Sequence, residues 1–598
     1  MARLVSPGYS NSVLIGSLLA PNPERIIEFK GLNRQRAVAE GEMSDMLNMT
    51  SDNYPLLTPR KARGYMPNPP GVIRPLRLMS KFDRIAMIAR LDTDPVTTAF
   101  YYNGTLVPAV DDLSESSRMV AINTKICFFP EKTYLEIAPD RTIGEYGSLE
   151  AVAEETTATV TISLDEVTIS LTDNPGFKYD DAVNIVGTLT YGSDQAECNV
   201  SVNVEDADEH TLYLPQGTFL ELIGSGVSSA SFNGIISREM PDLDHVVEWN
   251  NRLWGLSSAD NTVYACKLGD PTNWQYFQGT SLDSYFAQQG TDGAWTGMAV
   301  YSNHLICFKE DSICRIYGTA PSNYQVTNTE AFGVETGSPD SVITINDTVF
   351  YKSKIGIMAY SGGIPECISD KLAVKFKNVV AGTEKRKYYA SIKTPNGYEL
   401  MVFDTEKGVW HKEDDMRFRS CATIGDKLYF VNYLDDMLVC SEDLMCDEML
   451  FVGSDDVAGR IGIVNPATPE EDASAMDWMA VFGPFDEWIE EKKIYSKLAL
   501  RIISKSSEDN YLTDENDEPL MTEEGELLVL PNWLRVYISI DEGEWELVQN
   551  YEPASTKGDF IPIIPRRCDR YSVKVEGKGP YEIKTLTRRV RQGTFLRR

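Results

Sequence analysis

Histidine is scarce in this sequence, with four residues in 598, and the four lie far apart. The chain contains no H-E-x-x-H, G-x-S-x-G or Walker A sequence, so histidine–zinc, serine-nucleophile and phosphate-loop chemistries are not indicated. His245 and His304 fall in strand-like patterns, where we expect structural imidazoles. We therefore predict no catalytic residue, and we do not expect an enzyme.

Cysteine is thinly spread as well, with ten residues and no C-x-x-C. The closest pairs, Cys307/Cys314 and Cys440/Cys446, lack the further Cys and His residues that a metal site needs. Four of the ten lie in apolar strand patterns, which indicates buried thiols and folding in a reducing compartment: Cys127, Cys266, Cys307 and Cys421. We predict no metal and no cofactor.

An acidic stretch at 508–526 invites comparison with a calcium loop, because oxygen-bearing side chains alternate along it. The EF-hand pattern needs Gly at its sixth position and Glu at its twelfth, and this stretch has Pro519 and Gly525 there. The sequence therefore favours a solvated acidic hairpin over a calcium site.

Long apolar runs are missing too, since none approaches the 18 residues of a membrane span. The run at 12–20 is short and is preceded by one basic residue, Arg3, so we interpret it as structure and not as a targeting signal. We expect no membrane span.

Positive charge is in deficit, with 56 Lys and Arg against 89 Asp and Glu and a net charge of −33. Residues 1–84 carry an excess of about five positive charges and residues 551–598 an excess of about seven, so the middle carries about −45. Such an acidic body does not suit wrapping of nucleic acid. The basic ends suit docking between subunits or onto an acidic neighbour, and an accidental distribution is the alternative.

What the sequence does have is a recurring strand–turn–strand unit. Each unit is an apolar run, a two-residue turn of Asn, Asp or Gly, and a second apolar run ending near aromatics, which is typical of a tight β-hairpin. Successive turns near Asn251, Asn303 and Asp347 are about 40 to 55 residues apart, the period of a propeller blade. The clearest copies lie at 120–129, 246–255, 298–308, 342–351 and 421–430. We predict an all-β protein with a six- to seven-bladed β-propeller-like body.

The remaining segments differ in texture from the repeat. Residues 1–65 contain many prolines and one helical candidate at 33–49, and we predict an extended N-terminal docking arm. The propeller is expected at 66–144 and 236–455, interrupted at 145–235 by a small Thr- and Val-rich β-domain. A C-terminal β-domain, sandwich-like and carrying the acidic hairpin, is expected at 456–598.

Two groups of residues are candidate binding positions. Arg60, Lys61 and Arg63 form the basic end of the arm and are candidates for docking a partner. Trp254 and Trp274 are candidates for a glycan platform, although blade-to-blade packing is the interpretation we favour.

The segments 249–255 and 263–274, W-N-N-R-L-W-G and V-Y-A-C-K-L-G-D-P-T-N-W, carry a family resemblance. They resemble the propeller of tail nozzle (tail tubular) and packaged-DNA stabilisation proteins of short-tailed phages and of related Gram-positive phages. Residues 45–61, 308–318 and 403–413 fit the same group. The resemblance covers about residues 30–65 and 240–440, and it brings no catalytic positions.

The resemblance implies a structural virion protein that is made in the host cytoplasm. It would form a homo-oligomeric ring in the tail, usually a hexamer, below the portal and adaptor, continuing and closing the DNA channel. Its partners would be further copies, the portal and adaptor proteins, other tail proteins or fibres, and DNA that passes without sequence-specific binding.

Two other functions stay open from the sequence. One is a tail-tip receptor- or glycan-binding propeller that uses the Trp254/Trp274 region or the inserted domain. The other, which we rank lower, is a polysaccharide hydrolase, because the nearest match to a sialidase-type Asp-box, at 403–410, has Phe403 for the Ser and Thr405 for the Asp.

Overall fold

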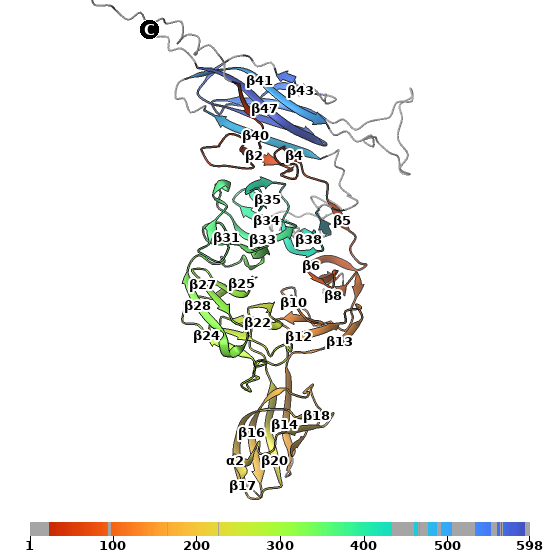
Figure 1. Cartoon of the computed structure of the whole chain (residues 1–598). Helices are drawn as coiled ribbons and strands as arrows, with labels where there is room; N and C mark the ends of the chain where they lie inside the picture. Colours follow the sequence, from red (N-terminus) through yellow and green to blue (C-terminus); the bar gives the residue numbers. More distant parts are fainter. Residues whose placement is uncertain are drawn as a thin grey trace, which may run out of the picture.

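The computed structural model shows an elongated, almost entirely β-stranded molecule (Figure 1). It describes residues 23–432 except 92, 94–96, 164, 165 and 225, and then 460–464, 466, 476–486, 492–504, 533–551, 559–561, 564 and 566–592. A β-sandwich lies at one end, a propeller in the middle and a small β-domain at the other end. The predicted fold class is confirmed.

The propeller has seven four-stranded antiparallel blades, at the upper end of the predicted number. Hairpin turns of the expected chemistry join the strands: Asn250 and Asn251, for example, both have positive φ, 53° and 58°, as a tight two-residue turn requires. The first six blades, innermost strand first, are β6–β9 (Val72–Lys81, Arg84–Leu91, Thr98–Tyr102, Thr105–Leu106), β10–β13 (Arg118–Ile122, Lys125–Phe129, Thr133–Ile137, Ile143–Ser148), β21–β24 (His245–Trp249, Arg252–Ser257, Thr262–Ala265, Tyr285–Gln288), β25–β28 (Trp295–Tyr301, His304–Lys309, Ser312–Tyr317, Gln325–Glu330), β29–β32 (Ile343–Ile345, Thr348–Lys352, Ile357–Tyr360, Glu366–Cys367) and β33–β36 (Lys377–Glu384, Lys387–Thr394, Gly397–Asp404, Val409–Lys412).

The seventh blade closes the propeller with a strand from the other end of the chain. It contains β37 (Phe418–Ile424), β38 (Lys427–Asn432) and β39 (Ile461–Ile463), and its outermost strand is the N-terminal β5 (Gly64–Met66). Met66 pairs with Ile461 and Gly64 with Ile463 in antiparallel register. This pairing fastens the first blade to the last.

The inserted domain is one seven-stranded sheet that leaves the propeller between the second and third blades. Its first strand begins at Ala151 and its last ends at Arg238, and these two residues are cross-strand partners. It has its own buried core. Its elements are β14 (Ala151–Ile162), β15 (Val167–Ser170), β16 (Ala182–Tyr191), β17 (Asp194–Asn203), β18 (Asp206–Ala207), β19 (Thr211–Leu214), the short helix α2 (Leu220–Ile223) and β20 (Ser229–Arg238).

The sandwich is formed by both ends of the chain. One sheet has the order β1 (Pro23–Ile26), β47 (Tyr581–Gln592), β41 (Lys493–Ser504), β44 (Asp559–Ile561), with β45 (Arg567–Cys568) beside β41. The other has the order β2 (Met43–Leu47), β40 (Asp477–Phe485), β46 (Tyr571–Lys578), β42 (Leu534–Ile540), β43 (Glu546–Tyr551).

The N-terminal arm therefore differs from the prediction over residues 23–66. These residues supply β1 and β2 to the sandwich, the short pair β3 (Met49–Thr50) and β4 (Thr58–Pro59), and β5 to the propeller. The helix predicted at 33–49 is wrong, because β2 pairs with β40 there, Leu47 opposite Met479. Sheet pairing over a distance of more than 400 residues overrides the local helical pattern. Residues 1–22 and the predicted hairpin at 508–526 lie outside the described residues.

Candidate functional site

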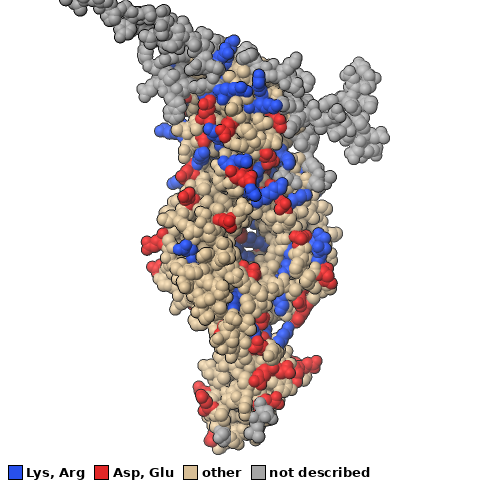
Figure 2. All heavy atoms as spheres, in the orientation of Figure 1, with Lys and Arg blue, Asp and Glu red and all other residues tan. Residues whose placement is uncertain are grey.

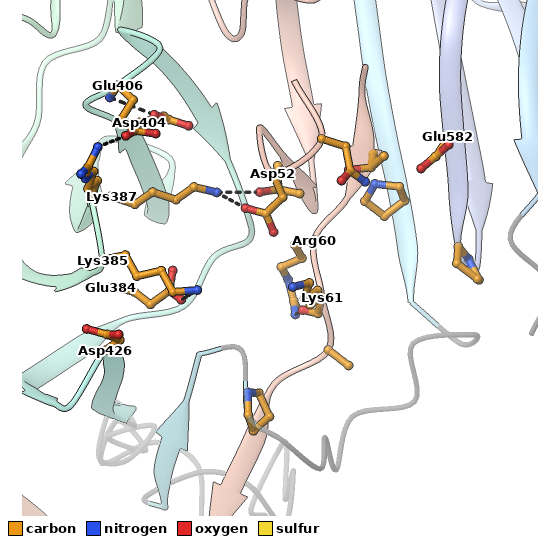
Figure 3. A pocket seen from close by; sticks show the side chains of 18 of the residues that line it. Asp52, Arg60, Lys61, Glu384, Lys385, Lys387, Asp404, Glu406, Asp426 and Glu582 are labelled. Carbon is orange, nitrogen blue, oxygen red and sulfur yellow. Dashed lines mark hydrogen bonds and ion pairs between the residues drawn. The ribbon is translucent and has the colours of Figure 1, made fainter. Parts of the chain in front are cut away.

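A cavity of about 1050 Å³ lies where the propeller faces the sandwich (Figure 3). Turns of the sixth and seventh blades form one wall, the β3–β4 segment another, and the start of β47 a third. The wall is dominated by charged side chains: Asp52, Arg60, Lys61, Glu384, Lys385, Arg386, Lys387, Asp404, Glu406, Asp426 and Glu582.

Many of these charges are already engaged with one another. Lys387 forms an ion pair with Asp52 and donates to the Thr50 hydroxyl at 3.0 Å. Burial alone would raise the pKa of Asp52, but Lys387 outweighs it and holds that pKa below its ordinary value. Arg386 is paired with Glu406. The pairs tie blade turns to each other and to the N-terminal segment.

Asp404 shows how such a carboxylate is satisfied by local structure. Its Oδ1 accepts the backbone N–H groups of Glu406 and Lys407, each at 3.0 Å, and its Oδ2 accepts the Ser51 hydroxyl at 2.6 Å. This is the turn that the sequence likened to an Asp-box. It closes a hairpin and buries Trp410.

The three basic residues predicted to dock a partner have different surroundings. Arg63 is only 1% exposed, and its guanidinium donates to Glu413 at 2.7 Å and to Asp414 at 2.6 Å. Arg60 is 8% exposed and donates through Nε to the Asn48 Oδ1 at 2.8 Å. Docking of a partner by Arg60 and Arg63 is therefore wrong, since both bind their own chain. Lys61 is exposed at the cavity wall.

His411 is the most unusual group beside this region. It is buried, and neither ring nitrogen has a hydrogen-bond partner among the described residues. Burial, together with the nearby Lys387, holds the pKa of His411 well below its ordinary value, against the opposing effect of Asp52. The imidazole is therefore a neutral packing group at pH 7.

A second cavity, about 280 Å³, follows the propeller axis and is lined by all seven innermost strands. The propeller is visibly hollowed at its centre in Figure 2. Asp340, in the turn η2 (Pro339–Ser341) before the fifth blade, lies 2.8 Å from Arg77 and 3.5 Å from Arg118. The two arginines outweigh burial and lower the pKa of Asp340. This triad links the first two blades to the fifth across the axis.

The sequence predicted that His245 and His304 are structural imidazoles, and the surroundings of both side chains agree with this. The Nε2 of His245 lies 3.3 Å from the Trp295 carbonyl oxygen, and burial lowers its pKa. The His304 ring packs at a tilt against the rings of Tyr301 and Tyr317 within its own blade.

The candidate glycan platform at Trp254 and Trp274 is wrong, because both rings are buried as the favoured packing interpretation requires. Trp254 is fully buried against Trp249 and Tyr324, between the third and fourth blades. Trp274 is 2% exposed and donates its Nε1–H to the Pro271 carbonyl at 2.8 Å. Buried rings cannot stack on a sugar, and they serve the packing that the sequence favoured.

Residues in the segments that carry the family resemblance also stabilise the local structure. Arg252 is 1% exposed and donates to the carbonyl oxygens of Cys266, Ser281 and Asp283 at 2.7, 2.7 and 2.6 Å. It thereby fixes the long loop between β23 and β24. Asn273, in that loop, accepts the Ala182 backbone N–H at 2.9 Å and so holds the inserted domain.

The described cysteines and carboxylates do not indicate a reactive thiol or a metal site. Burial raises the pKa of the Cys127 thiol to about 12, and Cys307 and Cys314 are buried cross-strand neighbours. Within the residues placed by the structure, no group of three or more His, Cys, Asp or Glu side chains is positioned to hold a metal ion. Across the same residues, no helix has the length and apolarity to cross a membrane.

Sequence reasoning missed Asp52, Lys387 and Asp340. Each pairs with a residue more than 200 positions away, so no local pattern marks it.

Comparisons with known proteins give distant likenesses. No family model matches the chain, and no curated protein matches it. Among solved structures it is similar to Hsv2 from Kluyvelomyces marxianus (13% identity, 41% of this chain and 70% of that chain, TM-score 0.23). It is also similar to a putative 6-phosphogluconolactonase from Bacteroides uniformis (12%, 46% and 89%, 0.23) and an exo-beta-1,3-galactanase from Phanerochaete chrysosporium (8%, 57% and 95%, 0.20). Such scores are too low to support an inference about activity.

Proposed function

We propose that this chain is a structural subunit of a phage tail, nozzle-like, which assembles with further copies into a ring around the path of the DNA. The proposal starts from the resemblance of residues 30–65 and 240–440 to tail nozzle proteins. It places the ring below the portal and adaptor.

One observation carries the proposal furthest: the N-terminal segment contributes strands to both the sandwich and the propeller and so joins them into one unit. Residues 23–66 supply strands to both sandwich sheets and then the closing strand of the propeller. Arg63 locks the end of this segment through Glu413 and Asp414. Parts joined by shared sheets resist separation better than parts joined by a linker, which suits a subunit that must keep its shape while DNA moves past it.

The charge distribution is consistent with a conduit. Acidic side chains gather on the inserted domain, and Lys and Arg gather on the sandwich (Figure 2). Acidic walls repel phosphates, so DNA would slide without being held. The basic sandwich end would favour an acidic neighbour.

The alternatives draw less support. A receptor platform at Trp254 and Trp274 would need exposed rings, and both are buried. A hydrolase would need a carboxylate pair available to a substrate, whereas Asp52, Asp404 and Glu406 are engaged by neighbours in the cavity between propeller and sandwich.

Cryo-electron microscopy of the intact particle tests the proposal. We expect a closed ring of this chain on the tail axis, with DNA in its channel or the channel sealed. A position on the periphery of the particle, away from the axis, would overturn the ring function. The purified chain should be imaged in parallel, to compare its fold with that in the particle.

A further inference from the structure

A third cavity lies at the joint between the inserted domain and the propeller. It is about 400 Å³, within the range of about 300–1,000 Å³ that is common for small-molecule sites. Its walls come from the second blade, from the segment between β15 and β16, from the end of β20, and from the loop between β23 and β24. We propose that this joint cleft binds a neutral saccharide. The inference goes beyond the ring function and does not depend on it.

The joint is held in place by buried polar contacts. Asp181 and Arg238 form an ion pair in which each side chain is only 4% exposed. Asp181 also accepts the Lys178 backbone N–H at 2.8 Å and the Asn273 amide at 3.1 Å. Lys267 of the propeller is paired with Asp180. The cleft therefore keeps its shape before a ligand arrives, which lowers the cost of binding.

The cleft is lined by charges of both signs. Its walls carry three cations and three carboxylates: Lys125, Lys178, Arg238, Glu145, Asp181 and Asp270. An anionic ligand would meet three carboxylates, and a cationic ligand would meet three positive groups. A sugar hydroxyl donates to a carboxylate and accepts from an ammonium at once, so a neutral polyhydroxylated ligand satisfies both kinds of wall.

An incomplete hydrogen-bond set in the wall points to a ligand. Arg238 is 4% exposed, and its Nε is buried with no acceptor among the described residues. Its Nη1 is occupied by Asp181 and by the Gly176 carbonyl oxygen. Buried donors are normally paired, so an oxygen atom brought by a ligand would complete this guanidinium.

An exposed tyrosine ring completes the chemistry expected of a sugar site. Tyr179 is 74% exposed at the cleft, an unusual exposure for a large aromatic side chain. Its ring presents an apolar face to the C–H groups of a sugar and a hydroxyl to its oxygens. Tyr134, also in the wall, is buried under the Lys125 ammonium, 4.3 Å from its ring centre, and does not offer such a face.

The test uses the full-length protein on an array that carries neutral, uronic-acid, sialylated and phosphate-bearing glycans, with affinities of retained glycans measured by calorimetry. We expect retention of neutral glycans. Lys178→Ala and Tyr179→Ala each remove an exposed side chain, and each should weaken binding about tenfold or more. Lys354→Ala, another exposed ion-paired lysine, and Phe286→Ala, another exposed aromatic residue, are matched controls and should bind like the wild type.

Three results would overturn the inference. They are an array with no retained glycan, a preference for acidic or phosphate-bearing glycans, and unchanged affinity in both cleft variants. Thermal unfolding of every variant checks that the fold is kept. Imaging of the particle decides the ring function separately, so a failure of either idea leaves the other standing.

Discussion

At the residue scale, the chain places its most costly groups where the N-terminal segment meets the propeller. Arg63 and Glu413 are nearly dehydrated, and buried His411 has no hydrogen-bond partner among the described residues. A buried charge is tolerated only while its partner is present. Single substitutions here should therefore have large and distinguishable effects.

Arg63→Ala should lower the free energy of unfolding by about 3–5 kcal/mol, because it leaves the Glu413 carboxylate buried without its partner. Urea unfolding followed by tryptophan fluorescence measures this. Arg386→Ala is the control, because Arg386 and Glu406 are 61% and 43% exposed, and it should cost less than about 1 kcal/mol. Equal losses in the two variants would contradict a stabilising role for the buried ion pair between Arg63 and Glu413.

His411→Leu should change how stability depends on pH. The folded-state pKa of His411 lies well below its unfolded value of about 6.5, so the unfolded chain binds the extra proton first. Stability of the wild type should thus fall as pH drops below about 6.5, and the variant should lose this part of the slope. The measurement is thermal unfolding between pH 7.5 and about pH 5. Parallel curves for the two proteins would show that the pKa of His411 is the same in the folded and the unfolded chain.

Trp254→Ala should destabilise the protein by about 3–5 kcal/mol, because a fully buried ring leaves a cavity between two blades. Phe277→Ala should have little effect, because that ring is 49% exposed. Thermal unfolding of the two variants separates blade packing from a surface role. A small loss at Trp254 would mean that the ring is not part of the core.

At the scale of elements, strand exchange between distant segments decides the architecture. β5 completes the last blade, and β1 and β2 complete the two sandwich sheets. Each supplies backbone hydrogen bonds to a strand that would otherwise be an open edge. The N-terminal residues are part of the folded body for this reason.

Two truncations test this arrangement. Removal of residues 1–66 should give an insoluble or unfolded product, because both sandwich sheets and the last blade lose a strand. Removal of residues 1–22 leaves all of these strands in place and should preserve the fold. Circular dichroism and gel filtration report the outcome. A folded product without residues 1–66 would show that the N-terminal strands are not needed for folding.

At the scale of the whole molecule, the inserted domain is a separable module. Ala151 and Arg238 are cross-strand partners, so a short turn can bridge the gap that removal of residues 151–238 leaves. The domain packs around its own core. Its attachment rests on a few polar contacts, such as Asn273 with Ala182.

Replacement of residues 151–238 by a short Gly- and Ser-rich turn should leave the propeller and sandwich folded. Calorimetry should show the loss of one unfolding transition while the others move by only a few degrees, because the inserted domain has a buried core of its own. Glycan binding should vanish in the same variant, since the cleft loses two of its walls, the segment between β15 and β16 and the end of β20. Collapse of every transition would show that the modules fold as one.

The sequence alone determined the parts of this protein that rest on local chemistry. Turn pairs such as Asn250-Asn251, with aromatic and apolar runs on either side, predict hairpins because only certain residues adopt positive φ and only one face of a strand is buried. From these came the all-β class, the repeated blades and the interruption after the second blade. Blade packing at Trp254, which we favoured from the sequence, also follows from that pattern.

Only the tertiary structure decided which distant segments meet. β5 pairs with β39 across nearly 400 residues, Asp340 reaches Arg77 and Arg118, and Arg238 meets Asp181 at the joint. The local sequence around Arg63 is the same whether its side chain faces solvent or Glu413. The basic stretch therefore predicted a docking surface where the folded chain has a buried ion pair. Hairpins are encoded by neighbours in the chain, whereas edge pairing, buried ion pairs and cavities are set by the global arrangement of the sheets.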